Sequence, residues 1–575
     1  MRRAAVASVA LLASVLGCSH GGSHSQDLLL LQLPAPLART RAERTSYAET
    51  STYADVISFI DSLQLDNVPF IREELGRTTE GRVLPLLILS RPNVATPEEA
   101  KRLRRPIVYV QANIHAGEVE GKEALLALVR DLANSSDNVL DSLVLIAVPI
   151  YNADGNERWM PQAVNRTEQN GPESVGQRPN AKMLDLNRDY VKAEAPETRA
   201  SLAAFEKWNP DVFVDLHTTD GSFHGYALTY APSLNPAALD AGAYTMDSLL
   251  PELRLRMQAR DGFAVFDYGN FDTQYEERDI SDTVKSGWYS YDHRPRFGTN
   301  YFGLRQRISI LSEAYSHDPF ERRVKSTYAF VRELLSLVAE RGARIRAIEA
   351  AADSGFARGN FTTPIPIRSR LTSTPTKEPV VFEVMAHTGD SSLTQPGVPR
   401  GFRRTGLMRT QTMPVYLRFE PVMTRTIPRA WLIPARDSAV IALLKLHGVR
   451  IERPAGGRAA IVMRRKGEAP VERPATPLTT ARVSLFVIDS MVSAPKEFQG
   501  HHEVRLSGSW RDTTVLIPGD MLTVRGDQLQ AVAALYLLDP ESDDGLVTWN
   551  VFDSELAPGK AFPVWRVLGA PNASP

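Results

Sequence analysis

The stretch PIVYVQANIHAGEVEGKEALLALVRDLAN, residues 106–134, decides the fold of this chain. Residues 106–114 are apolar enough for a buried strand, and residues 118–134 carry their apolar side chains at helical spacing. A buried strand followed at once by an amphipathic helix is the repeating unit of α/β domains. We therefore predict an α/β fold with a largely parallel sheet.

Strands and helices alternate on both sides of this stretch. The predicted helices are residues 53–63, 196–208 and 318–350, and the predicted strands are residues 83–90, 143–152, 211–217 and 307–313. Between them, residues 155–183 are polar and show no periodicity. A loop of that length inside a compact domain is usually functional, so we expect this one to have a functional role.

The chain changes character beyond the last of these helices. Residues 361–379 are rich in Pro, Ser and Thr and are typical of a linker, and most segments after them are predicted to be short strands. With 575 residues, the chain is long enough for two or three domains. We expect a catalytic domain over residues 46–350, a linker over 351–380, and a β-rich C-terminal region over 381–575 without catalytic chemistry.

Charge and cysteine content exclude several classes of protein. Lys and Arg (66) balance Asp and Glu (67) to a net charge of -1, so no nucleic-acid partner is expected. The acidic stretch YLLDPESDDGLVTWNVFD, residues 536–553, is interpreted as a loop and helix cap, because it lacks the ligand spacing of known Ca²⁺ sites. The single cysteine, Cys18, lies outside the predicted domains, which excludes a disulfide scaffold, a cysteine-based zinc ribbon and a cysteine protease.

Cys18 ends an apolar N-terminal run. Two arginines precede the run AAVASVALLASVLG, which is too short to span a membrane as a helix but suits a signal peptide. Because residues 15–18, Val-Leu-Gly-Cys, resemble a bacterial lipobox, we expect residues 1–18 to be a signal peptide that ends in a lipidated cysteine. Residues 19–45 would then be a tether, and the protein would be exported across the inner membrane to the periplasm or cell envelope, held to a membrane only by this lipid. A plain secretory signal with an incidental cysteine is the alternative.

Chemistry-bearing residues lie at the ends of two predicted strands. His115 and Glu118 follow the strand of residues 106–114, and His217 closes the strand of residues 211–217. Open α/β sheets bind ligands at the carboxyl ends of their strands, which is where both histidines fall. Two histidines and one glutamate are the ligand set of a catalytic zinc site, with a fourth position left for water.

A further acidic residue, Glu313, ends the apolar strand of residues 307–313. A buried carboxylate without a partner destabilises a protein by several kcal/mol. Glu313 therefore either faces a cleft or forms a salt bridge with an arginine, and the strand pattern leaves both readings open.

Together these segments resemble the zinc carboxypeptidase family, the carboxypeptidase A-like metallopeptidases. The family's motifs occur here in order: H-x-x-E at 115–118, P-x-x-N-x-D-G at 149–155, D-x-N-R at 185–188, then His217 and Glu313. The resemblance covers residues 50–345. It implies a mixed, largely parallel twisted sheet with helices on both faces, and one Zn²⁺ per chain held by His115, Glu118 and His217.

The resemblance also implies a role for each remaining residue. Asp185 matches the carboxylate that orients the first histidine ligand, and Asn187 and Arg188 match the pair that holds a substrate's terminal carboxylate. Arg166 is the candidate for the arginine that polarises the scissile carbonyl. Glu313 matches the general base, so a peptide or peptide-like substrate would lose its C-terminal residue to a metal-activated water.

Two departures from the family pattern and two alternative functions stay open. Gly117 stands where digestive members have an arginine, and Tyr289, Tyr291 and Tyr301 compete for the place of the tyrosine that covers the substrate. A zinc amidase or deacylase of the same fold, acting on small N-acyl amino acids or peptidoglycan stem peptides, would keep the same ligands and Glu313. A degenerate envelope-anchored binding protein is less favoured because those residues are intact. The sequence lacks the motifs of serine hydrolases and P-loop enzymes.

Overall fold

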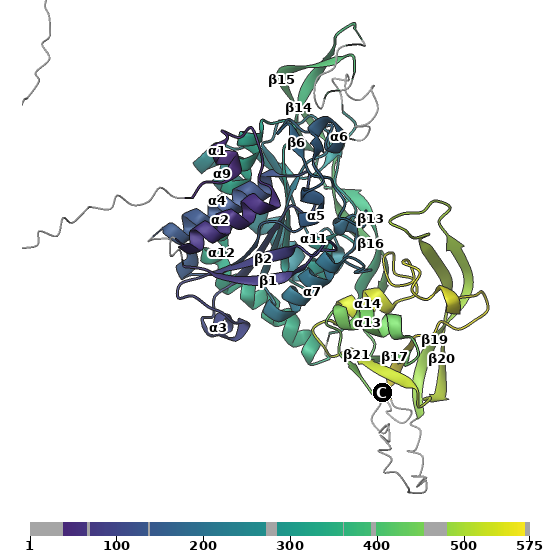
Figure 1. The fold of residues 1–575 in the computed structure, drawn as a ribbon. Coiled ribbons are helices and arrows are strands. Elements are labelled where there is room, and N and C mark those ends of the chain that lie inside the picture. Colours follow the sequence, from purple (N-terminus) through teal and green to yellow (C-terminus); the bar gives the residue numbers. More distant parts are fainter. Residues whose placement is uncertain are drawn as a thin grey trace, which may run out of the picture. The chain divides into compact units, whose positions relative to one another are not determined.

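An eight-stranded sheet forms the centre of the fold (Figure 1). Its strands are β1 (Ile71–Arg77), β2 (Val83–Leu89), β3 (Ile107–Ala112), β4 (Val144–Val148), β7 (Val212–Thr218), β8 (Leu228–Pro232), β9 (Val265–Asp267) and β12 (Ile308–Ala314). They are ordered β1-β2-β4-β3-β7-β12-β8-β9. The middle strands β4, β3, β7 and β12 run parallel, and antiparallel pairs flank them on both sides. The predicted mixed, largely parallel sheet is confirmed.

This computed structural model describes residues 38–65, 69–135, 139–271, 285–359, 361–390, 392, 398, 400–453 and 480–569. Cys18, the lipobox-like segment and most of the expected tether lie outside these residues and stay predictions. Within the described ranges, no helix has the length and apolar composition needed to cross a membrane.

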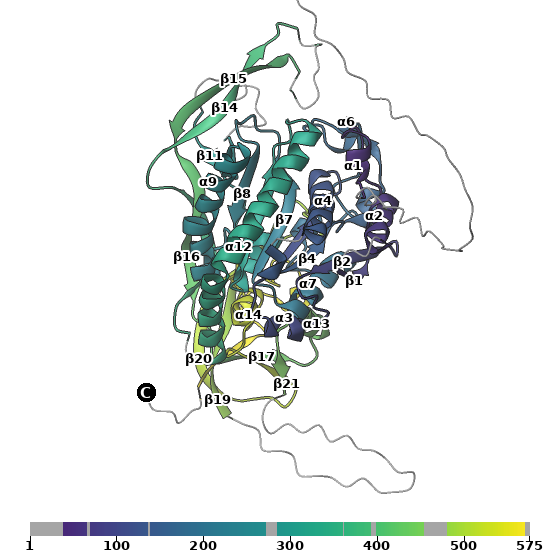
Figure 2. The same ribbon diagram turned by 90° about the vertical axis from the view of Figure 1, so that its left-hand side faces the viewer.

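Helices cover both faces of the sheet (Figure 2). One face packs against α2 (Tyr53–Leu65), α4 (Glu120–Asn134), α9 (Leu250–Asp261) and α12 (Phe320–Ala357), and the other against α7 (Pro196–Trp208) and α11 (Gly298–Leu304). Because both faces are covered, every residue of β3, β4, β7 and β12 is buried. This double burial explains why these strands are nearly continuous apolar runs in the sequence.

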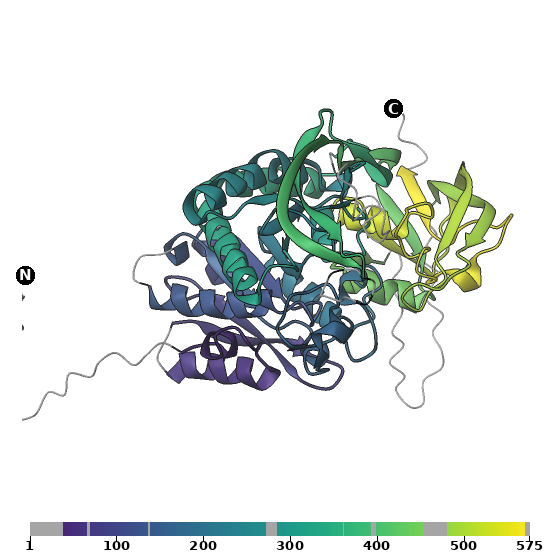
Figure 3. The same ribbon diagram turned by 90° about the horizontal axis from the view of Figure 1, so that it is seen from above.

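The chain after α12 consists mostly of strands, drawn in green to yellow in Figure 3. It contains a hairpin of β14 (Glu378–His387) and β15 (Phe402–Met413). A six-stranded sheet follows, in the order β18 (Ile451–Glu452), β21 (Met521–Arg525), β17 (Ala430–Pro434), β22 (Trp565–Gly569), β19 (Thr480–Ser493) and β20 (Val504–Leu516). Helices α13 (Ser438–Leu446) and α14 (Ala531–Leu538) share its apolar core. The predicted β-rich character of this region is confirmed.

Two segments expected to be connectors contain ordered elements instead. The expected linker over 351–380 holds the last turns of α12 and the strand β13 (Ile365–Ser373), which pairs with β16 (Val415–Arg425). Ile365 and Ile367 are fully buried, and Pro366 is tolerated because β13 lies at the edge of its sheet. The expected tether also ends before residue 45, because α1 (Arg41–Arg44) begins with a capping box at Thr40.

The sheet that contains β13 and β16 joins the two predicted regions. Its other strands, β10 (Asn270–Phe271) and β11 (Trp288–Tyr289), come from the expected catalytic domain, and β11 runs parallel to β16. Residues Ala38–Pro575 accordingly form one compact unit. The C-terminal region is thus interwoven with the α/β part.

Candidate active site

His115 and Glu118 lie in a tight turn between β3 and α4. The Glu118 N–H donates to the His115 carbonyl over 3.0 Å. Gly117 is needed in this turn, because a Cβ there would lie 2.8 Å from both Cγ of Arg166 and the carbonyl oxygen of Gly176. The arginine that digestive family members carry at this place would not fit, since Arg166 already fills the space.

His217 and Glu313 are neighbours on adjacent parallel strands. His217 lies on β7 and Glu313 on β12, and the strand register pairs them directly. The same register pairs Asp215 with Leu311, two residues earlier on each strand. Side chains two apart on a strand share a face, so all four project from the same side of the sheet. The carboxyl ends of β3, β7 and β12 therefore carry the candidate site, in agreement with the strand-end argument.

The three predicted metal ligands meet one another. Nδ1 of His115 lies 3.0 Å from Oε1 of Glu118, and Nδ1 of His217 lies 3.0 Å from Oε2 of the same carboxylate. The two Nδ1 atoms are 3.2 Å apart, and all three side chains are buried. One ligand atom from each residue lies within 4.8 Å of the others, and no second group of this kind occurs in the described ranges.

Each histidine turns its second ring nitrogen toward a carboxylate. Nε2 of His115 lies 3.0 Å from Oδ1 of Asp185, and Nε2 of His217 lies 3.1 Å from Oδ2 of Asp215. A carboxylate behind each imidazole fixes the tautomer that leaves Nδ1 free to bind a metal ion. This donor set fits zinc and leaves a place for water or substrate. Asp215 was not among the residues expected in the site, although its place two residues before His217 on a strand is the signal that points to it.

Burial and neighbouring charges shift the pKa values of the two glutamates in opposite directions. Burial raises the pKa of Glu118, but His115 and Arg166 outweigh it and hold that pKa well below its usual range. Burial raises the pKa of Glu313 well above its usual range, with His217 opposing the rise and Glu118 adding to it. Glu118 is therefore ionised, as a metal ligand must be, and Glu313 is suited to accept and pass on a proton.

The site residues surround a cavity of about 120 Å³. Its wall combines the metal-ligand group with basic, acidic and aromatic side chains: His115, Glu118, Arg178, Asn187, Arg188, His217, Thr218, Asp220, Tyr268, Tyr291, Phe297, Leu311 and Glu313. Glu313 is 8% exposed, and among the described residues its carboxylate has neither a hydrogen-bond nor an ion-pair partner. Of the two readings open from the sequence, Glu313 thus faces a cleft.

Asn187 and Arg188 lie in a short 3₁₀ turn that begins after Asp185. The Gly298 N–H donates to Oδ1 of Asn187 over 2.9 Å. The Arg188 guanidinium lies over the Phe297 ring, 4.0 Å from its centroid, and donates to the Asn187 carbonyl over 2.9 Å. Within the described part of the chain no carboxylate lies at ion-pair distance from this guanidinium, so its charge remains free for an anionic ligand.

Arg166 lies in a different place from the one predicted. Its guanidinium is buried, donates to Oε1 of Glu118 over 2.9 Å and to the carbonyls of Thr218 and Thr219, and forms no part of the cavity wall. Arg178 lines the cavity instead. Its Nε donates to Oδ2 of Asp185 over 3.0 Å. Of the two arginines, Arg178 is thus the one that faces the cavity.

The structure distinguishes the three tyrosines that compete in the sequence. Tyr291 lines the cavity. Tyr289 stacks on Tyr416 with ring centroids 4.4 Å apart, and the Tyr301 hydroxyl is 2.6 Å from Nδ1 of His447. Tyr291 is therefore the one of the three that is placed to contact a bound substrate.

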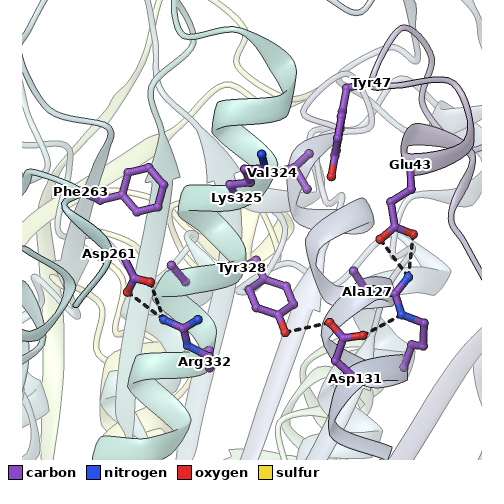
Figure 4. Close-up of a pocket in the computed structure, with 12 residues that line it drawn as sticks. Glu43, Tyr47, Ala127, Asp131, Asp261, Phe263, Val324, Lys325, Tyr328 and Arg332 are labelled. Carbon is purple, nitrogen blue, oxygen red and sulfur yellow. Dashed lines mark hydrogen bonds and ion pairs between the residues drawn. The ribbon is translucent and has the colours of Figure 1, made fainter. Parts of the chain in front are cut away.

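A second hollow, lined in part by residues of α1, α4 and α12, contains charges that are already paired (Figure 4). Arg332 binds Asp261 over 2.6 Å. Asp131 accepts hydrogen bonds from Tyr328 over 2.9 Å and from Arg130 over 2.7 Å. Because these groups satisfy one another and none of the predicted site residues borders the hollow, we assign it no chemistry.

Comparison with known proteins gives consistent matches. The family model described as zinc carboxypeptidase matches residues 56–296. Carboxypeptidase 2 of Trichophyton rubrum is 24% identical over 522 residues, which cover 88% of this chain and 85% of that protein. Carboxypeptidase D of Homo sapiens is 34% identical over 159 residues, 26% of this chain and 10% of that protein. A solved metallo-carboxypeptidase from Burkholderia cenocepacia is 20% identical and covers 50% of this chain and 69% of its own, with a TM-score of 0.36.

The α/β sheet and the His-Glu-His group at its strand ends fit a metallopeptidase, because this group could hold a metal ion. Residues 56–296 match the model of the zinc carboxypeptidase family, and this match together with the similar carboxypeptidases supports an enzyme of the metallocarboxypeptidase type. The family match ends before Glu313, so the assignment of this residue rests on the pairing of β12 with β7.

Proposed function

We propose that this chain removes C-terminal residues from peptides as a zinc-dependent metallocarboxypeptidase. The observation that carries the proposal is the Arg188 guanidinium, which has no carboxylate partner among the described residues and lies in the same small cavity as His115, Glu118 and His217. A guanidinium without a carboxylate partner is suited to a carboxylate that the substrate brings. The bond nearest to a terminal carboxylate is the last peptide bond of the chain.

His115, Glu118 and His217 would hold the zinc ion. Bound there, zinc would act as a Lewis acid on the scissile carbonyl and lower the pKa of a water molecule. Asp185 and Asp215 orient the two imidazoles, so that both Nδ1 atoms turn toward Glu118.

Glu313 is the general base of the proposed reaction. Its carboxylate faces the cavity beside His217 across the β7–β12 pair. Glu313 accepts a proton from the attacking water as the water oxygen bonds to the scissile carbonyl carbon. It then gives this proton to the leaving nitrogen as the C–N bond breaks. The products are a free amino acid and a peptide that is one residue shorter and ends in a new carboxylate.

Two arginines have separate roles toward the substrate. The planar guanidinium of Arg188 can donate two parallel hydrogen bonds to the terminal carboxylate, next to the amide of Asn187. Arg178 lies on the cavity wall with Nη1 3.5 Å from Oε1 of Glu118, and it stabilises the negative charge that develops on the carbonyl oxygen. The apolar part of the wall, which would receive the C-terminal side chain, is formed by Tyr268, Tyr291, Phe297 and Leu311.

The test is cleavage of matched peptides that differ only in a free-acid or an amidated C-terminus. We expect mass spectrometry to show stepwise loss of C-terminal residues from the free acids only. We also expect about one zinc per chain in the same sample, and loss of activity on chelation. Equal cleavage of both peptides would contradict the proposal. Cleavage of N-acyl amino acids with peptides left intact would favour the amidase or deacylase alternative.

The sequence carries a further proposal about location: the mature protein is anchored in the cell envelope through a lipid on Cys18. In a bacterial host, Cys18→Ser should move the protein from the membrane fraction to the soluble periplasmic fraction. Unchanged association with membranes would show that the anchor does not exist.

A further inference from the structure

Residues 296–298, next to the cavity, form one of the contacts between the α/β part and the C-terminal region. Arg296 is 1% exposed and is bound by two acids of the C-terminal region. Its N–H donates to Oδ2 of Asp544 over 2.7 Å, and its Nε and Nη2 donate to Oδ1 of Asp544 over 3.0 and 2.7 Å. Its Nη1 donates to Oε1 of Glu503 over 2.6 Å. This set of charge-assisted bonds fixes the backbone and the side chain of Arg296 together.

The residues that follow Arg296 contact the pair proposed to bind the substrate carboxylate. The Phe297 ring lies under the Arg188 guanidinium at 4.0 Å, and the Gly298 N–H donates to Oδ1 of Asn187 over 2.9 Å. The segment therefore has Asp544 and Glu503 on one side and Asn187 and Arg188 on the other. A shift of this segment would move Phe297 and Gly298, and with them both carboxylate-binding side chains.

A second contact comes from the loop between β19 and β20. Oε1 of Gln499 accepts the N–H of Asp185 over 3.0 Å, at the start of the turn that carries Asn187 and Arg188. The C-terminal region thus holds this turn at its first residue, and also from the side of residues 296–298.

The two acids of this contact pair with Arg296 and do not pair with Arg188. Asp544 is fully buried, and its Oδ1 also accepts the Trp549 Nε1–H over 3.0 Å. Asp544 and Glu503 pair with Arg296, and Glu503 also lies 3.5 Å from Arg294. Arg188 keeps its charge without an ion-pair partner among the described residues, so it is the cation left for a ligand.

We infer that Asp544 and Glu503 are positioning residues for substrate binding. Through Arg296 they hold Phe297 and Gly298 against Arg188 and Asn187, and so they set the affinity for the terminal carboxylate. The inference rests on the proposed carboxypeptidase function and gives the C-terminal region a role in it. The match to the Trichophyton rubrum protein covers 88% of this chain, so it extends well past residue 296 into this region.

Asp539 provides a matched control in the same acidic stretch. Its carboxylate is also fully buried and binds two arginines, Arg566 and Arg425, the latter at 3.7 Å. Neither arginine belongs to residues 296–298. Loss of charge at Asp539 therefore perturbs the C-terminal core without acting on Phe297 or Gly298 directly.

The experiment compares Asp544→Asn, Glu503→Gln and Asp539→Asn with wild type in the full chain. KM and kcat are measured on a peptide with a free C-terminus, together with zinc content and melting temperature. We expect KM to rise at least about tenfold in Asp544→Asn, and less in Glu503→Gln, with a smaller change in kcat. Zinc content should stay at the wild-type level. Asp539→Asn should lower the melting temperature and change KM by less than about twofold.

Unchanged KM in both Asp544→Asn and Glu503→Gln, with an active wild type, would overturn the inference and leave the proposed function standing. An equal rise of KM in Asp539→Asn would also overturn it, because the effect would then be general destabilisation. If Asp544→Asn does not fold, Glu503→Gln decides the matter, since its side chain is 15% exposed. A wild type that cleaves no free-acid peptide would overturn the function and the inference together.

Discussion

Glu313 and His115 line the same cavity, but substitution of Glu313 should affect catalysis alone, whereas substitution of His115 should also affect zinc binding. Glu313→Gln keeps the shape of the side chain and cannot accept a proton, so hydrolysis should fall by about 10²–10⁴-fold while zinc content stays near wild type. His115→Ala removes a ligand, so zinc and activity should disappear together. Zinc stoichiometry and hydrolysis rate on the same samples check both expectations. Near-normal turnover by Glu313→Gln would make Glu313 a structural acid.

Single residues are predictable from this sequence where they follow a periodic element. His115, His217 and Glu313 come at or just after the ends of apolar strands, and parallel pairing brings such ends to one edge of the sheet. Arg166 and Arg178 both lie in the aperiodic stretch 155–183, where spacing does not determine which guanidinium reaches the cavity. Arg166 is held away from the cavity by its contacts with Glu118 and with the turn at Gly117. These contacts form only in the folded chain.

Among the elements, the buried middle strands of the large sheet are predictable from their apolar pattern. The expected strands correspond to β2, β3, β4, β7 and β12, and the expected long helix corresponds to α12, whereas β1, β8, β9, α9 and α11 were not among the expected elements. β13 was expected to be part of a linker, because its prolines, serines and threonines are typical of one. Its partner β16 lies far along the chain, and only this pairing turns the segment into an edge strand.

A substitution in β13 tests whether the segment belongs to the core. Ile367 is fully buried, so Ile367→Ala should lower the free energy of unfolding by about 2–5 kcal/mol. Arg370 on the same strand has a side chain that is 72% exposed. Arg370→Ala should therefore change the free energy of unfolding by less than about 0.5 kcal/mol. Chemical denaturation of both variants gives the two values. Equal, small effects would mean that 361–379 is a linker after all.

For the whole molecule, the sequence does not indicate that the C-terminal region contacts residues next to the site. Arg296 and Asp544 are 248 residues apart, and nothing in either local pattern links them. The acidic stretch 536–553 is the end of α14 and the loop after it, as expected, and its acids also pair with arginines and with His293. Such long-range pairs depend on how complete sheets pack, which composition and periodicity do not encode.

The contact between the two regions should make stability depend on pH at His293. Its Nδ1 is 3.4 Å from Asp292, and its Nε2 is 2.9 Å from Asp543 of the C-terminal region. Burial lowers the pKa of His293, but the hydrogen bonds to Asp292 and Asp543 outweigh it and raise the pKa to about 9. An unfolded histidine titrates near about pH 6.5, so this stabilisation is fully present below that pH and is lost as pH rises through about 9.

Comparison with His293→Gln isolates this contribution. The difference in free energy of unfolding between wild type and the variant should shrink by up to about 3 kcal/mol between about pH 6 and about pH 10. Denaturant titrations at several pH values in this window measure it. A difference that does not change with pH would show that His293 is neutral in the folded protein.

The central claim is that Arg188 receives the terminal carboxylate of a peptide substrate. The measurement is kcat/KM of wild type and Arg188→Ala on one peptide, supplied as the free acid and as the amide. The substitution should lower kcat/KM for the free acid by a factor that corresponds to about 2–5 kcal/mol of free energy, mainly by raising KM. The amide should be a poor substrate for both proteins and little changed. Equal cleavage of acid and amide by wild type, or an equal loss on both in Arg188→Ala, would contradict the account.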